Sequence, residues 1–117
     1  MTYTDVASMV DSIGIPCAYY QFTKETAKPC PFICFYYGDS NDFAADNTNY
    51  QRIRQLLIEL YTDEKDFTLE ETVETTLNSY GLVYTRSESP IDSERMYMVV
   101  FTTDIVITEE NTNGEQD

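Results

Sequence analysis

The first apolar pattern along the chain is that of a short amphipathic helix over residues 4–13. Thr4 or Asp5 suits its N-cap, because a short polar side chain there accepts a hydrogen bond from the unpaired N–H groups of the first turn. Gly14 suits the position after the last turn, where many helices end in a left-handed conformation. The apolar residues recur at three- and four-residue steps and therefore share one face: Val6, Met9, Val10 and Ile13.

A second helix is predicted from Leu69 to Tyr80. Thr68 and Glu71 have the spacing of a capping box, with Thr68 as N-cap and Glu71 three residues later. Gly81 then ends the helix. Its inner face is predicted from the same periodicity: Leu69, Val73, Leu77 and Tyr80.

Several other segments have the aromatic and β-branched character of strands. The strongest is Phe32–Tyr37, which lies between Pro31 and Gly38. The pattern predicts further strands at residues 18–22, 82–85 and 95–108, the last as one long strand or two continuous ones. The segments that separate them are rich in turn-forming residues and are predicted as loops: 23–31, 38–49 and 87–93.

Residues 50–62 fit two patterns. Ile53, Leu56, Leu57 and Leu60 form a helical stripe, whereas Leu56, Ile58 and Leu60 equally form one face of a strand. Leu, Gln, Arg and Glu in this segment slightly favour the helix. Periodicity alone therefore leaves both structures open.

Size and composition indicate one folded domain. The chain has 117 residues, and single domains cluster at roughly 100–150 residues. We expect the domain to span residues 1–108, followed by an acidic, flexible tail over 109–117. The N-terminus lacks the basic and apolar regions of a signal peptide, and no apolar run is long enough to cross a membrane. The three cysteines are then expected as reduced thiols.

The charge excludes some partners. Seven Lys and Arg face 21 Asp and Glu, so the formal net charge is −14. Such a surface repels phosphate, so we expect no direct affinity for nucleic acid or for anionic membranes. Two explanations of the acidity stay open. The first is solubility. The second is a specialised surface that either lies near nucleic acid without binding it or imitates nucleic acid.

The chemistry of an enzyme is missing from the sequence. There is no histidine, the commonest general base near neutral pH. The motifs of serine hydrolases, P-loops and dinucleotide-binding folds are also missing. We therefore expect no catalytic activity and no cofactor.

Metal binding is also not expected. Cys30 and Cys34 are separated by three residues, have apolar neighbours and, without histidine, make a poor zinc site, so these thiols are interpreted as core residues. The acidic segment from Asp39 to Asn47 superficially resembles a calcium loop. It lacks the alternate ligands, the central glycine and the terminal Glu of an EF-hand, so a solvated loop is expected.

Tyrosines on the predicted strands are candidates for an interface. Adjacent strand residues point to opposite faces, so one ring of the pair Tyr36–Tyr37 must point away from the core. Exposed tyrosine is enriched at protein interfaces. The candidates are Tyr36, Tyr37 and Tyr61; the alternative is a half-buried sheet face that a helix covers.

Three phrases of the sequence carry a family resemblance. They are Gly14-Ile15-Pro16-Cys17-Ala18-Tyr19, Pro31-Phe32-Ile33-Cys34-Phe35-Tyr36 and Asp42-Phe43-Ala44-Ala45-Asp46, and residues 58–66 followed by the second helix continue the pattern. Over roughly residues 12–108 the chain resembles the tail-terminator, or tail-completion, proteins of long-tailed phages and prophages.

The resemblance favours a strand at residues 50–62. The order of elements is then α-β-β-β-α-β-β, with a mostly antiparallel or mixed sheet of four to five strands and two helices. This order predicts an α+β fold, in which the helices lie on one face of the sheet.

The resemblance also implies a role in virion assembly. Tail terminators form hexameric rings that cap the tail tube and join it to the head. It implies that partners are further copies of the chain, with a monomer in isolation as the alternative, the major tail tube protein and the head–tail connector. The location implied is the virion tail, assembled in the bacterial cytoplasm. Positions matching a contact loop of the family are Gly38, Asp39, Asp42, Phe43, Ala44, Ala45 and Asp46.

Two alternative functions stay open. A head–tail connector or completion protein has a similar size, and an acidic inhibitor that mimics DNA would have a similar charge. A DNA mimic requires carboxylates in regularly spaced, exposed rows. Many of the acidic residues here lie instead in predicted loops and in the tail.

Overall fold

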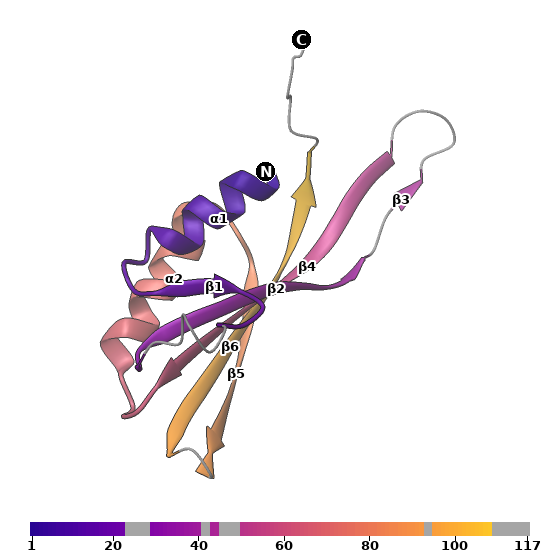
Figure 1. Ribbon diagram of the computed structural model, residues 1–117. Helices are drawn as coiled ribbons and strands as arrows, with labels where there is room; N and C mark the ends of the chain where they lie inside the picture. The colour runs from indigo at the N-terminus through magenta and orange to yellow at the C-terminus, as the bar shows by residue number, and fades with distance from the viewer. Residues whose placement is uncertain (23–28, 41–42, 45–49, 93–94, 109–117) are drawn as a thin grey trace.

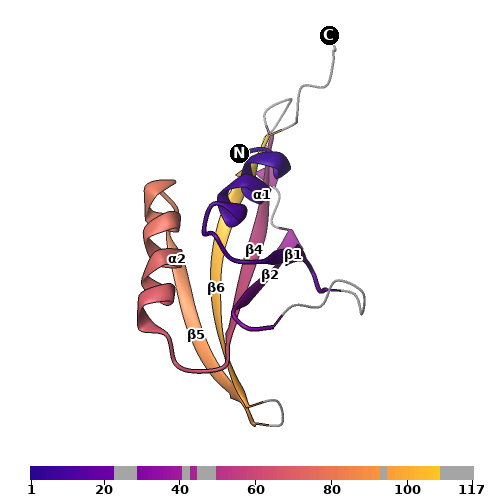
Figure 2. The same cartoon turned by 60° about the vertical axis from the view of Figure 1, so that its left-hand side comes forward.

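The protein is a mixed β-sheet with two helices on one face (Figures 1 and 2). The computed structural model describes residues 1–22, 29–40, 43–44, 50–92 and 95–108. The helices are α1 (Tyr3–Asp11) and α2 (Phe67–Ser79), and the strands are β1 (Cys17–Tyr19), β2 (Phe32–Ser40), β3 (Phe43–Ala44), β4 (Tyr50–Thr62), β5 (Tyr84–Ile91) and β6 (Met96–Ile107). The predicted α+β class and order of elements are confirmed.

The sheet is built around the long strand β4. The strands lie in the order β1-β2-β4-β6-β5, and the short β3 pairs with one end of β4. Only β1 and β2 are parallel among these pairs, so the sheet is mixed. Residues 50–62 form a strand, as the resemblance favoured, and their helical stripe is not used. The reason lies in their neighbours, because β4 pairs with β2 on one side and with β6 over eleven residues on the other.

The core lies between the helices and one face of the sheet. Alternate residues of β4, Leu56, Ile58 and Leu60, are at most 1% exposed and lie opposite buried or half-buried residues of β2 and buried residues of β6. The predicted inner face of the first helix is confirmed. The helical residues of the core are Val6, Met9, Val10, Val73 and Leu77, with Ile13 just after α1.

The first helix starts one residue and the second two residues earlier than predicted, because other side chains cap them. Thr2, and not Thr4 or Asp5, is the N-cap of α1, and it forms a capping box with Asp5. Asp66, and not Thr68, is the N-cap of α2, and its carboxylate accepts a hydrogen bond from the N–H of Leu69. The predicted capping box of Thr68 and Glu71 is therefore wrong.

The ends of the helices and the first strand also differ in detail. Gly14 and Gly81 have φ angles of +95° and +73° beyond the two helices, as expected for terminating glycines. Tyr80 of the predicted inner face is 45% exposed. The first strand covers Cys17–Tyr19 rather than residues 18–22, because Tyr20 has a φ of +71° and leaves the extended conformation.

Residues 87–93 were predicted as a loop, which is wrong for most of the segment. A single strand, β5, runs from Tyr84 to Ile91 and includes Pro90. It pairs with β6 only and forms an edge of the sheet. Proline has no N–H to donate. An edge strand tolerates this, because its backbone groups on the free side have no neighbouring strand to bond. β6 is one continuous strand, which decides between the two predicted forms of residues 95–108.

We predict that Leu77→Ala destabilises the fold by about 2–5 kcal/mol, because Leu77 is fully buried and its loss leaves a cavity under α2. Urea unfolding followed by circular dichroism measures the change. Val83→Ala is the control, since Val83 is 88% exposed and its truncation should change stability by less than about 0.5 kcal/mol. Equal effects of the two substitutions would contradict this position of the core.

Candidate functional site

The predicted contact loop, residues 38–49, is in part strand. Gly38 and Asp39 belong to the end of β2, and Phe43 and Ala44 form β3, where they pair with Gln51 and Tyr50 of β4. The prediction of one long loop is wrong for these residues. Backbone pairing with β4 explains the difference. Together these strands project beyond the helices as an arm (Figure 1). Asp42, Ala45 and Asp46 lie outside the described residues.

Gly38 lies at an irregular point in the pairing of β2 with β4. The register between the two strands shifts between Tyr37 and Ser40. A Cβ atom at Gly38 would lie 2.5 Å from Oε1 of Gln55 and 3.0 Å from Cδ1 of Leu57. Glycine therefore suits this irregular point at the base of the arm.

The two neighbouring tyrosines of β2 point to opposite faces, as predicted. Tyr37 lies on the helical side, where its ring meets Tyr3 of α1 edge-on at 5.2 Å and lies under the guanidinium of Arg54 at 5.3 Å. Burial and the neighbouring tyrosines raise the pKa of Tyr37 to about 12. Tyr37 is thus part of the packing of α1, whereas Tyr36 lies on the face that the described helices leave uncovered.

Tyr36 and Tyr61 meet at a carboxylate on this uncovered face. The hydroxyl of Tyr36 donates a hydrogen bond to Oε2 of Glu59 at 2.9 Å, and the hydroxyl of Tyr61 donates to Oε1 at 2.7 Å. The three residues come from β2 and β4. The structure therefore brings two of the three predicted interface tyrosines together around Glu59, which the sequence did not single out.

The phenols of this cluster keep their protons at neutral pH. Burial, followed by the hydrogen bond to Glu59, raises the pKa of Tyr36 to about 12. The same causes raise the pKa of Tyr61. Both hydroxyls therefore act as donors, and the cluster carries the negative charge of the carboxylate alone.

The cluster lines a hollow with a volume of about 470 Å³. Its walls come from the residues that follow β1, from β2 and from β4. The lining residues are Tyr20, Gln21, Phe22, Phe32, Cys34, Tyr36, Glu59 and Tyr61.

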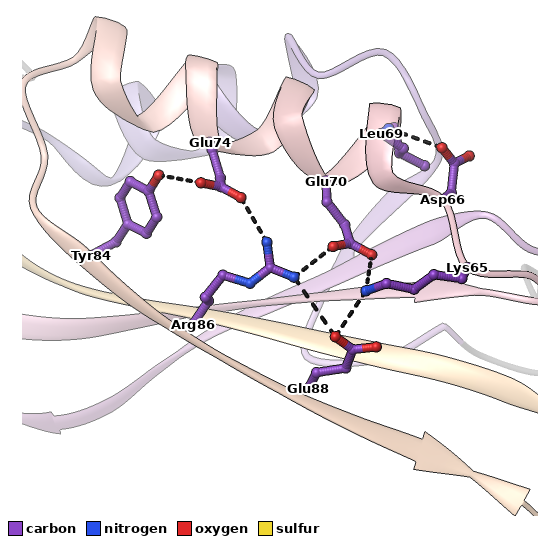
Figure 3. A network of polar contacts seen from close by, with 8 residues as sticks. All are labelled: Lys65, Asp66, Leu69, Glu70, Glu74, Tyr84, Arg86 and Glu88. Atoms are coloured by element: carbon purple, nitrogen blue, oxygen red, sulfur yellow. Dashed lines mark hydrogen bonds and ion pairs between the residues drawn. The ribbon is translucent and has the colours of Figure 1, made fainter.

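A second polar cluster joins α2 to the edge strand β5 (Figure 3). Glu70 is 2% exposed and lies 2.6 Å from Nζ of Lys65 and 2.5 Å from Nη2 of Arg86. Arg86 also binds Glu74 at 2.7 Å, and Lys65 binds Glu88 at 2.8 Å. Burial by itself would raise the pKa of Glu70, but the bonds and charges of Lys65 and Arg86 more than offset it, so the pKa lies below its usual value.

This second cluster was missed by the sequence analysis, although one signal was present. Glu70 precedes Val73 by three positions and Leu77 by seven, so it shares their helical face. A carboxylate on a buried face requires a partner. Its partners Lys65 and Arg86 lie on other elements, and only the fold brings them there. The cluster is a structural bridge, because its charges are satisfied among themselves.

The three cysteines are free. Cys34 is buried, as predicted for a core thiol, while Cys17 and Cys30 are half-buried. Burial raises the pKa of each thiol. Within the described residues there is no group of three or more His, Cys, Asp or Glu side chains that could hold a metal ion. The helices in this part of the chain are too short and polar to span a membrane.

Comparison with solved structures yields a likeness in fold. No protein-family model matches the sequence, and no curated protein matches it. Among solved structures, the chain is similar to a chain in the virion of a native gene transfer agent (GTA) particle, with a TM-score of 0.50. The likeness covers 86% of this chain and 85% of that chain at 14% sequence identity. At this identity the likeness establishes a shared fold over nearly the whole domain.

We predict that Glu70→Gln lowers the free energy of unfolding at pH 7 by about 1–3 kcal/mol, because Lys65 and Arg86 lose a buried anionic partner. The folded pKa of Glu70 is lowered, so its stabilisation is full above the ordinary Glu pKa and is lost as the pH falls through the folded value.

Urea unfolding at pH 7 and at pH 3 measures this difference. The difference in the free energy of unfolding between the wild type and Glu70→Gln should be smaller at the lower pH. Glu71→Gln is the matched control, since Glu71 is the next residue of α2 and is exposed. A pH-independent gap would contradict the role of the ionised carboxylate.

Proposed function

We propose that this chain is a structural protein of a phage-like virion and acts as a tail terminator. One observation carries the proposal: the chain has the fold of a chain in the virion of a gene transfer agent particle over nearly its full length. The sequence resemblance to tail terminators was drawn from short phrases, independently of the fold. The two agree on a virion component.

The uncovered face of the sheet supports an assembly role. On the side away from the described helices, β4 and β6 place Ile53 opposite Val106 and Glu59 opposite Val100. Val106 is 43% exposed, and its apolar neighbours on this face are half-buried. Apolar surface that a chain leaves uncovered is characteristic of protein interfaces. In the proposed role, this surface is covered in the assembled particle.

The arm of β2, β3 and β4 supplies the second contact of the proposal. The residues of the arm are Gly38, Asp39, Asp42, Phe43, Ala44, Ala45 and Asp46, and Tyr36 and Tyr61 are further candidates on the uncovered face of the sheet. They would contact a neighbouring copy in a hexameric ring or the end of the tail tube. The other partner is the head–tail connector, and the ring assembles in the host cytoplasm before it joins the virion. The acidic surface suits a ring through which DNA passes without binding.

The tail-terminator role predicts a defect in tail length. Deleting the gene from its phage or prophage should give overlong tails without heads, because nothing stops growth of the tube. Negative-stain electron microscopy of the lysate measures tail length. The wild-type gene on a plasmid should restore the normal length. Tails of normal length that fail to join heads would instead indicate a connector, and normal complete virions would exclude both roles.

The uncovered face predicts a second result. Val106→Glu should reduce plasmid rescue of the deletion by at least about tenfold, because it places a charge in the proposed interface. Val106 is exposed in the chain, so thermal unfolding should change by only a few degrees. Thr75→Glu on the exposed side of α2 is the matched control and should rescue fully. Full rescue by Val106→Glu would argue against this face as an interface.

A further inference from the structure

The hollow around Glu59 has the composition of a cation-binding site. Aromatic rings form its walls: Phe32 stacks on Tyr61 with ring centroids 4.9 Å apart, and Phe22 meets Phe32 edge-on at 5.4 Å. Tyr20 and Tyr36 also line the hollow, with ring centroids 5.2 Å apart. The face of an aromatic ring is electron-rich and attracts a cation placed over it.

Among the described residues that line the hollow, Glu59 alone carries a formal charge. Each of its oxygens accepts one phenol hydrogen bond. A carboxylate oxygen has two lone pairs, so each retains capacity for a further donor. Among the described residues, no Lys or Arg nitrogen forms an ion pair with Glu59. Glu70 differs, because two cations neutralise it.

We propose that this hollow binds the guanidinium or ammonium group of an Arg or Lys side chain from a partner protein. The cation would donate to the free lone pairs of Glu59 and lie against the surrounding rings. A hydrogen bond between charged groups and a cation–π contact both favour such a group over a neutral one. The raised pKa values of both phenols keep them neutral at pH 7, so neither adds a negative charge that would repel the carboxylate.

The surroundings of the hollow favour a protein as the source of the cation. In the β4–β6 ladder, Tyr61 lies opposite Met98 and Glu59 opposite Val100, so half-buried apolar residues continue directly from the hollow. A small free cation would fill the hollow and leave this apolar surface exposed. A protein that presents a basic side chain beside apolar residues would cover both.

Charge favours a different protein over a second copy of this chain. Each copy has only seven Lys and Arg beside 21 Asp and Glu, so a second copy offers few basic side chains to the hollow. Two basic residues of the chain, Lys65 and Arg86, are already bound within the second polar cluster. A basic surface on another protein is complementary to this chain.

The binding test uses the isolated chain, so its result does not depend on the proposed virion role. N-acetyl-arginine amide is titrated into the ¹⁵N- and ¹³C-labelled protein, with N-acetyl-glutamine amide as the neutral probe. We expect saturable NMR shifts of Tyr36, Tyr61 and Phe32 with the arginine probe only. Glu59→Gln should weaken binding at least about tenfold.

Two further variants make the result specific. Asp104→Asn removes one carboxylate from the same sheet face, outside the hollow, and should leave binding unchanged. Phe32→Leu removes an aromatic wall but keeps an apolar side chain, and should weaken binding about threefold. It also provides a test if Glu59→Gln does not fold. Equal effects of Glu59→Gln and Asp104→Asn, or no shift at these rings, would overturn the proposal.

The remaining occupants are separated by their own outcomes. Tighter binding of the probe to a Lys24→Gln, Lys28→Gln double variant would assign the hollow to the chain's own lysines. Spermidine that binds more tightly than both the arginine probe and N-acetyl-lysine amide would assign it to a free polyamine. Self-association in sedimentation velocity that Glu59→Gln abolishes would assign it to a second copy. Each of these three results would overturn the assignment to a partner protein.

Discussion

The alternation of β4 is the constraint on which the rest of this structure depends. This strand pairs on both sides, so its register is fixed by β2 and by β6 at once. It places Leu56, Ile58 and Leu60 beneath the helices and directs Leu57, Glu59 and Tyr61 to the opposite face. A shift of one residue would exchange the two sets. The core and the aromatic hollow are therefore two results of one register.

The two glutamates at the centres of the polar clusters illustrate how environment decides a role. Glu70 lies under α2 with two cations in direct contact, so its charge is neutralised and ties the helix to β5. Glu59 meets only hydroxyl donors among the described residues, which orient its oxygens without cancelling their charge. The charge of Glu70 is paired within the chain. The charge of Glu59 meets no cation among the described residues and can attract one from outside.

Much of the fold was predictable because helices and strands leave different spacings in the sequence. The apolar face of α1 and the glycines beyond both helices were read correctly. The helix–strand ambiguity of residues 50–62 and the extent of β5 were not decided by local pattern, since pairing with β6 determines both. Of the candidate site, the outward position of Tyr36 followed from alternation. Glu59 and Glu70 did not, because their partners come from other elements.

The edges of the sheet have a consequence for the kind of aggregate that this chain avoids. β1 is only three residues long, and β5 carries Arg86, Glu88 and Pro90. Short, charged or proline-containing edges resist pairing with the strands of other molecules. In the described part of the chain, continuous growth by strand addition is thus disfavoured at β1 and at β5, which makes fibre formation through these two strands unfavourable.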